Sequence, residues 1–176
     1  MEIYFLRHAN AGEPKLNPAK DEQRPLDDLG VEQSHIVGCA LAALQLKLDA
    51  IISSPLVRAK QTAEIVAGEI GHEDKLITDD ALRPEASYDG FQQLLARHKD
   101  KDAIMVVGHN PSLTEFLNQL ITGDAREAVE LKKGAVARVD KEGRKPSVLK
   151  WCMPPKGVRA IQQASASSSR PKTVSK

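Results

Sequence analysis

Apolar residues in this chain gather in short runs, and stretches with the spacing of helices lie between them. Residues 2–6, 49–53 and 103–107 are such runs, and their length and composition are typical of buried strands. Small and aliphatic residues between 59 and 70 recur at spacings of four, three and four, which predicts one buried helix face. Further helices are expected from Asp27 or Asp28 to about Leu46, at 88–98 and at 112–121, with a weak strand at 76–78.

Turn-forming residues mark the ends of these elements. Ser54 and Pro55 are predicted to start the helix after the second run, with Ser54 as capping residue and Pro55 at the first helical position. Gly71 is predicted to end that helix in a left-handed conformation. Residues 135–139 and 147–151 flank a turn-forming stretch, which predicts a hairpin.

The alternation of strands with helices predicts an α/β three-layer sandwich, in which helices cover both faces of a mostly parallel central sheet. Residues 1–155 are expected to form this one domain, because a chain of 176 residues suffices for a single sizeable core. Residues 156–176 follow two prolines and become rich in Ser, Lys and Arg, so a flexible tail is expected there.

The composition limits the classes of function. Charged residues make up 28% of the chain, but the formal net charge is only +1, so nothing indicates a nucleic-acid or membrane partner. Aromatic residues, at 3%, are too few for a platform that stacks nucleic-acid bases. The sequence shows neither an apolar run long enough to span a membrane nor a signal peptide, so a cytoplasmic protein is expected. Two cysteines without a CxxC spacing predict neither a disulfide framework nor a zinc site.

Basic side chains directly follow three of the predicted strands. The first strand ends in Arg7 and His8, the second leads through Ser54 to Arg58, and the third ends in Gly108 and His109. Ligands of open α/β sheets bind beyond the carboxyl ends of the strands. We therefore expect two arginines and two histidines to meet at one edge of the sheet.

This set of side chains suits phosphoryl transfer. Planar guanidinium groups bind the oxygens of a phosphoryl dianion bidentately. One neutral imidazole can attack phosphorus in line to form a covalent phosphohistidine, and the second, if protonated, would neutralise the transferring group. The sequence contains no Walker-type glycine loop and no acidic cluster spaced to hold magnesium, so neither a metal nor another cofactor is expected.

These motifs resemble a known family, the histidine phosphatase (phosphoglycerate mutase-like) superfamily. The resemblance rests on the pair Arg7 and His8, on the pattern Ser-x-x-x-Arg-Ala-x-x-Thr at 54–62, and on His109 after a later strand. It covers residues 1 to about 153. Within the superfamily, three further stretches are similar to the small SixA-type phosphohistidine phosphatases: 24–26, 82–84 and 108–111.

The resemblance implies a role for each motif residue. His8 would be the nucleophile. The side chains that would bind the phosphoryl group are Arg7, Arg58, His109 and, from the long first loop, Arg24. Asn110 is expected to orient its loop, because Asn-Pro favours a turn, and a phosphate contact is the alternative for this residue. Larger members carry insertions that form a lid, for which this chain has little room, so an open site without a large cap domain is expected.

The proton donor for the leaving group remains open at this point. Glu85 is the nearest candidate by position, and Asp21 and Glu22 in the first loop are others. SixA-type members often lack an acid at the position of Glu85. Because an imidazole is expelled more easily than an alkoxide, a site without a strong acid would favour cleavage of a nitrogen–phosphorus bond.

The expected function is hydrolysis of phosphohistidine in proteins, through a phosphohistidine intermediate on His8. The expected partner is a phosphohistidine-bearing protein, for example a phosphotransfer domain, and the enzyme is expected to be a monomer. Two alternatives use the same site. In one the enzyme hydrolyses small phosphomonoesters, and in the other the chain is a non-catalytic module that binds phosphoryl groups.

Overall fold

A single six-stranded sheet lies at the centre of the computed structural model, which describes residues 1–124, 126–143 and 145–168. Across the sheet the strands are β3 (Leu76–Thr78), β2 (Ala50–Ser53), β4 (Ala103–Gly108), β1 (Glu2–Arg7), β5 (Val136–Asp140) and β6 (Val148–Met153). The first four run parallel, whereas β5 pairs antiparallel with β1 and β6 pairs antiparallel with β5. The predicted mostly parallel sheet and its terminal hairpin are confirmed.

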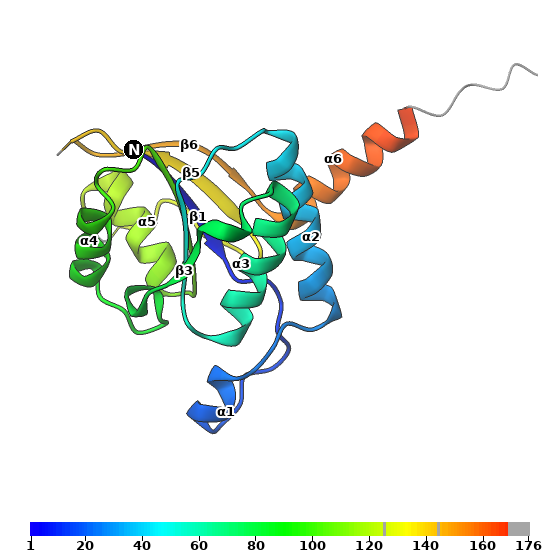
Figure 1. Cartoon of the computed structure of the whole chain (residues 1–176), viewed down its shortest axis with the longest axis horizontal. Coiled ribbons are helices and arrows are strands. Elements are labelled where there is room, and N and C mark those ends of the chain that lie inside the picture. Colours follow the sequence, from blue (N-terminus) through cyan, green and yellow to red (C-terminus); the bar gives the residue numbers. More distant parts are fainter. Residues whose placement is uncertain (125, 144, 169–176) are drawn as a thin grey trace, which may run out of the picture.

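Helices cover both faces of this sheet (Figure 1). The helices are α2 (Asp28–Ala43) and α3 (Val57–Ile70) on one face, and α4 (Tyr88–Arg97) and α5 (Ser112–Thr122) on the other. Successive side chains of a strand point to opposite faces. Ile3 and Phe5 of β1 therefore pack with α4 and α5, while Tyr4 and Leu6 pack with α2 and α3. The three-layer α/β sandwich is confirmed, and the described residues contain no large cap domain.

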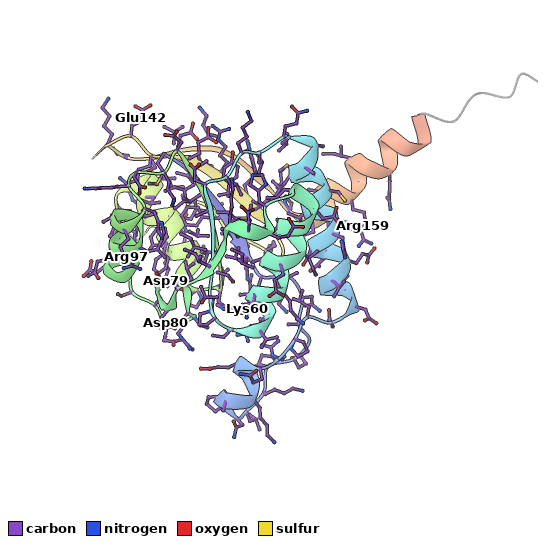
Figure 2. All side chains as sticks on the ribbon, in the orientation of Figure 1. Lys60, Asp79, Asp80, Arg97, Glu142 and Arg159 are labelled. Carbon is purple, nitrogen blue, oxygen red and sulfur yellow. The ribbon has the colours of Figure 1, made fainter. Side chains whose placement is uncertain are left out.

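Short elements complete the connections between these layers. They are α1 (Pro18–Glu22) and the 3-10 turns Glu73–Lys75 and Asp80–Leu82. Figure 1 shows α1 standing apart from the body of the fold, within a stretch that the sequence predicts as loop. Figure 2 labels Arg97 of α4 and Asp79 after β3, which form an ion pair and so tie α4 to the end of that strand.

Two predicted helix ends are wrong. Helix α2, expected to run to about Leu46, stops at Ala43 because Gln45, with φ of +53°, takes a left-handed conformation. Helix α3 begins at Val57 and not at Pro55, and Ser54 does not cap it. The backbone N–H of Ser54 still donates to Val107 of β4 at 2.9 Å, so the chain leaves the sheet only after this residue. Gly71 does end α3 in a left-handed conformation, as predicted.

Part of the stretch that the sequence predicts as a flexible tail is helical, because α6 spans Pro155–Ser168. Val158 is buried, and Arg159 forms a 2.9 Å ion pair with Glu32 of α2, so the start of α6 is anchored. From there α6 extends away from the sheet (Figures 1 and 2). The last part of the expected tail, residues 169–176, lies outside the described residues.

Gly30 offers a test of how the loop after β1 is held. A Cβ at this position would lie 1.9 Å from the carbonyl oxygen of Asn10, so Gly30→Ala should force the loop away from α2. We expect the free energy of unfolding to fall by about 1–3 kcal/mol, measured by urea denaturation. The matched control is Gly68→Ala, at an exposed helical position where a Cβ meets no atom closer than 3.8 Å. It should stabilise the protein by about 0.5–1 kcal/mol; equal effects of the two substitutions would contradict the predicted clash.

Candidate active site

The four predicted basic residues meet at the carboxyl edge of the parallel strands. Arg7 is the last residue of β1 and pairs in register with Gly108 of β4. Beyond the strands, the backbone N–H of His8 donates to the carbonyl of Gly108 at 3.0 Å. His109 therefore follows β4 at the level at which His8 follows β1. Arg58 reaches the same edge from the first turn of α3.

The two imidazoles lie against each other and are almost fully buried. Their ring centroids are 4.8 Å apart with the planes inclined by 52°, and His8 and His109 are 7% and 2% exposed. Nδ1 of His8 lies 2.7 Å from the carbonyl oxygen of Ala9. Because a carbonyl oxygen only accepts, Nδ1 must carry the proton. In the neutral ring the lone pair is then on Nε2, which becomes the nucleophilic atom.

Both imidazoles are neutral at physiological pH. Burial, together with the positive charges of Arg58 and Arg7, lowers the pKa of His8 to about 3. Burial also lowers the pKa of His109 to about 2, with contributions from His8 and the same two arginines. A neutral His8 keeps the lone pair that the predicted nucleophile requires. The second imidazole, considered above as a cation, is neutral without substrate and can donate through only one ring nitrogen.

The two arginines are held by backbone carbonyls. Arg7 donates from Nη1 to Leu131 at 2.9 Å, and Arg58 donates from Nη1 to Asp21 at 2.9 Å. Among the described residues, four buried side-chain atoms have no hydrogen-bond partner, and three belong to this site: Arg7 Nε, Arg58 Nε and His109 Nδ1. Buried polar groups without partners are rare in proteins. The oxygens of a phosphoryl group are the acceptors that these nitrogens would require.

Asp21 joins the long first loop to the site. Its carboxylate accepts from Arg24 Nε at 2.8 Å and lies 3.3 Å from Arg58 Nη1. The hydrogen bond from Arg24 is the main cause that lowers the pKa of Asp21 to about 2, so this side chain is ionised. Arg24 also donates to the carbonyl of Ala11 at 2.6 Å. The structure thus brings Arg24 beside Arg58 and gives it a visible task, which is to hold the loop.

Residues 131–134 form a wall of the site that the sequence does not predict. The carbonyl of Leu131 accepts from both Arg7 and Asn110, the latter at 3.1 Å. Lys133 donates to the side chain of Asn10 at 2.9 Å, and its charge lowers the pKa of His8. The N–H of Gly134 bonds the carbonyls of Arg7 and His8, and Gly134 has φ of +70°. Only the glycine after two lysines could have indicated a turn here.

The candidate proton donors differ in their surroundings. Glu22 pairs with Arg83 at 3.0 Å, and Asp21 is ionised and bound to the arginines, so neither suits proton donation. Glu85 is exposed, in the turn after the stretch 82–84. That stretch contacts the His109 loop, because Ser112 Oγ donates to the carbonyl of Arg83 at 3.2 Å. Glu85 therefore stays the candidate by position.

Neither a metal-binding cluster nor a membrane-spanning helix occurs in the described ranges of the chain. No group of three or more His, Cys, Asp or Glu side chains there is arranged to hold a metal ion. In the same ranges, no helix has the length and apolar character needed to cross a membrane.

Comparison with known proteins places this fold and site in a family. The profile of the histidine phosphatase superfamily (branch 1) matches residues 3–92. An uncharacterised protein of Picosynechococcus is 35% identical over 77% of this chain and 82% of its own length. The phosphohistidine phosphatase SixA of Escherichia coli is 24% identical over 88% of this chain and 94% of its own. A structure of SixA complexed with tungstate superposes with a TM-score of 0.78 at 21% identity, covering 90% of this chain and 99% of that one.

The chain belongs to the histidine phosphatase superfamily, and the predicted membership is confirmed. Its similarity to SixA over nearly the whole length supports the predicted branch. The chain is therefore a phosphatase of this superfamily with the phosphoglycerate mutase-like fold.

The lowered pKa values of the two imidazoles predict a loss of stability in mild acid. In the unfolded chain, His8 and His109 bind protons below about pH 6.5. In the folded chain, where their pKa values are about 3 and about 2, both rings stay unprotonated down to those pH values. Their contribution to stability is therefore complete above pH 6.5 and is lost as the pH falls. His109→Gln removes one of these groups, so its unfolding free energy should fall less steeply between pH 6 and 4, by roughly 1 kcal/mol per pH unit. Parallel curves in urea denaturation would contradict buried neutral imidazoles.

Proposed function

We propose that this phosphatase hydrolyses phosphohistidine in proteins through a covalent intermediate on His8. One observation carries the proposal: the hydrogen bond between Nδ1 of His8 and the carbonyl of Ala9, which leaves Nε2 as a neutral nucleophile. Arg7 and Arg58 lie close enough for their charges to act on both imidazoles. The similarity to SixA, itself named a phosphohistidine phosphatase, supports the same substrate class.

In the first step, Nε2 of His8 attacks the phosphorus atom in line with the scissile nitrogen–phosphorus bond. That bond breaks and its electron pair stays on the departing imidazole, which leaves as a neutral ring because its other nitrogen carries a proton. The phosphoryl group becomes bonded to Nε2. Arg7 and Arg58 bind the equatorial oxygens, where their fixed charges stabilise the transition state. Because Nδ1 keeps its proton and its bond to Ala9, His8 does not rotate during the transfer.

In the second step, water attacks the phosphorus of phosphorylated His8. The bond between Nε2 and phosphorus breaks, inorganic phosphate leaves, and the lone pair returns to Nε2. The same arginines serve both steps because the transferring group does not move far between them. Arg24 and Asn110 are proposed to act mainly by holding loops, since Arg24 binds Asp21 and Asn110 binds Leu131.

The surroundings of the site suit a phosphoryl group carried by a protein. No large cap domain among the described residues covers the site. A groove of about 950 Å³ begins at Asn110 and runs between α5 and the stretch 127–130. It adjoins the wall that holds Arg7, and the charge of Glu130, which lines the groove, acts on the Arg7 guanidinium. A polypeptide that bears the phosphohistidine, such as a phosphotransfer domain, would have room to lie there.

Substitution of His8 tests both the mechanism and the substrate. His8→Ala should abolish turnover of a phosphohistidine-bearing phosphotransfer domain and remove the acid-labile phospho-enzyme trapped from labelled substrate. The control His35→Ala, at an exposed helical position, should keep both. Sugar phosphates, nucleotides and p-nitrophenyl phosphate assayed in parallel should give a kcat/KM at least about a hundredfold lower. A higher kcat/KM on a small ester would favour the phosphomonoesterase alternative, and binding without turnover on every substrate would favour a non-catalytic module.

Glu85 tests whether an acid assists the leaving group. An imidazole departs readily, and Glu85 is exposed, so Glu85→Gln should lower kcat for the phosphohistidine substrate by less than about threefold. The control Asp89→Asn removes another exposed carboxylate nearby in the chain. A loss of tenfold or more that is specific to Glu85→Gln, with the alkaline limb of the pH profile removed, would make Glu85 the proton donor, because a general acid loses its proton as the pH rises.

A further inference from the structure

Ser54 directly follows β2 and is buried beside the site. It does not cap α3, because the capping position of that helix is Leu56. The side chain of Ser54 is 0% exposed. The hydroxyl oxygen accepts from the backbone N–H of Leu56 at 3.3 Å, and it lies 2.9 Å from Nε2 of His109. Ser54 thus joins the turn that leads to Arg58 with the second imidazole.

The direction of the bond between Ser54 and His109 follows from counting donors and acceptors. A hydroxyl has one proton to donate, and Leu56 already occupies one of its two acceptor positions. If Nε2 of His109 carried the proton, the buried hydroxyl proton of Ser54 and the lone pair on Nδ1 would both lack partners. If Ser54 donates to Nε2, the hydroxyl is satisfied and only the proton on Nδ1 remains without a partner, as observed for that nitrogen.

The second arrangement costs less because it leaves one buried polar group unpaired where the first leaves two. It also matters for catalysis. Nε2 is occupied by Ser54, so Nδ1 is the ring nitrogen that remains for a phosphoryl oxygen. A neutral imidazole assists there only if Nδ1 carries the proton, since a lone pair on Nδ1 would repel the oxygen.

We propose that Ser54 is a positioning residue that holds His109 in the tautomer protonated on Nδ1, so that this nitrogen donates to the phosphoryl group. Both imidazoles then have the tautomer protonated on Nδ1, which a hydrogen-bond acceptor fixes in one ring and a hydrogen-bond donor fixes in the other. The carbonyl of Ala9 makes His8 a nucleophile at Nε2, and the hydroxyl of Ser54 makes His109 a donor at Nδ1. The catalytic part of this inference rests on the proposed function; the tautomer itself does not.

The direct test is nitrogen NMR of the unliganded full-length protein, with long-range proton–nitrogen spectra that separate protonated from unprotonated ring nitrogens. Wild-type His109 should be protonated on Nδ1. In Ser54→Ala the Nδ1 tautomer should lose its dominance, and kcat/KM for the phosphohistidine substrate should fall by about ten- to a hundredfold, the worth of one hydrogen bond to a charged group. Ser54→Thr keeps the hydroxyl and should restore the tautomer.

Ser53→Ala is the matched control. Ser53 is equally buried and adjacent, but its hydroxyl donates to the carbonyl of Ser54 at 2.9 Å and not to an imidazole. It should leave the spectrum of His109 and kcat/KM unchanged. A wild-type proton on Nε2 would overturn the proposal even if Ser54→Ala failed to fold, and so would an unchanged spectrum and kcat/KM in a folded Ser54→Ala. Failure of the proposed function is a separate result, seen as retained turnover in His8→Ala.

Discussion

The parallel pairing of β1 with β4 is the constraint on which the site depends. Arg7 pairs with Gly108, so His8 and His109 leave the sheet at the same level. The pairing of Ser53 with Val107 brings Ser54 to the adjoining level of Gly108. Both faces of these strands are buried, so a slip by one residue would exchange their two apolar faces. The core that fixes the register therefore also fixes the separation of the two imidazoles.

Much of this arrangement follows from the sequence. The three apolar runs predict the parallel strands, and the basic residues after them predict the site, because strand ends of one direction share an edge. The start of α3 could not be predicted from Ser54 and Pro55, since a serine suited to capping was used for a contact with His109, far away in the sequence. The polar composition of the end of α6 predicted a tail and not a helix, although the start of α6 packs through buried Val158.

Contacts between distant segments account for the remaining differences. The carbonyl oxygen of Leu131 accepts from Arg7, and the ammonium group of Lys133 donates to Asn10. Neither a backbone acceptor nor a single lysine forms a recognisable sequence motif. The role of Asp21 was equally hidden. Its position in the loop suggested a proton donor, whereas its contacts with Arg24 and Arg58 make it an ionised partner of the arginines.

The electrostatics of the site change when a phosphoryl dianion enters. Burial and the charges of Arg7 and Arg58 keep both imidazoles unprotonated, which preserves the lone pair needed for attack. The dianion offsets those same charges, so the bound complex no longer opposes a proton on an imidazole as strongly. A site built this way has a neutral nucleophile before binding and tolerates positive charge beside the phosphoryl group afterwards. Fixed tautomers make this sequence possible, because each ring must offer the correct nitrogen before any proton is gained.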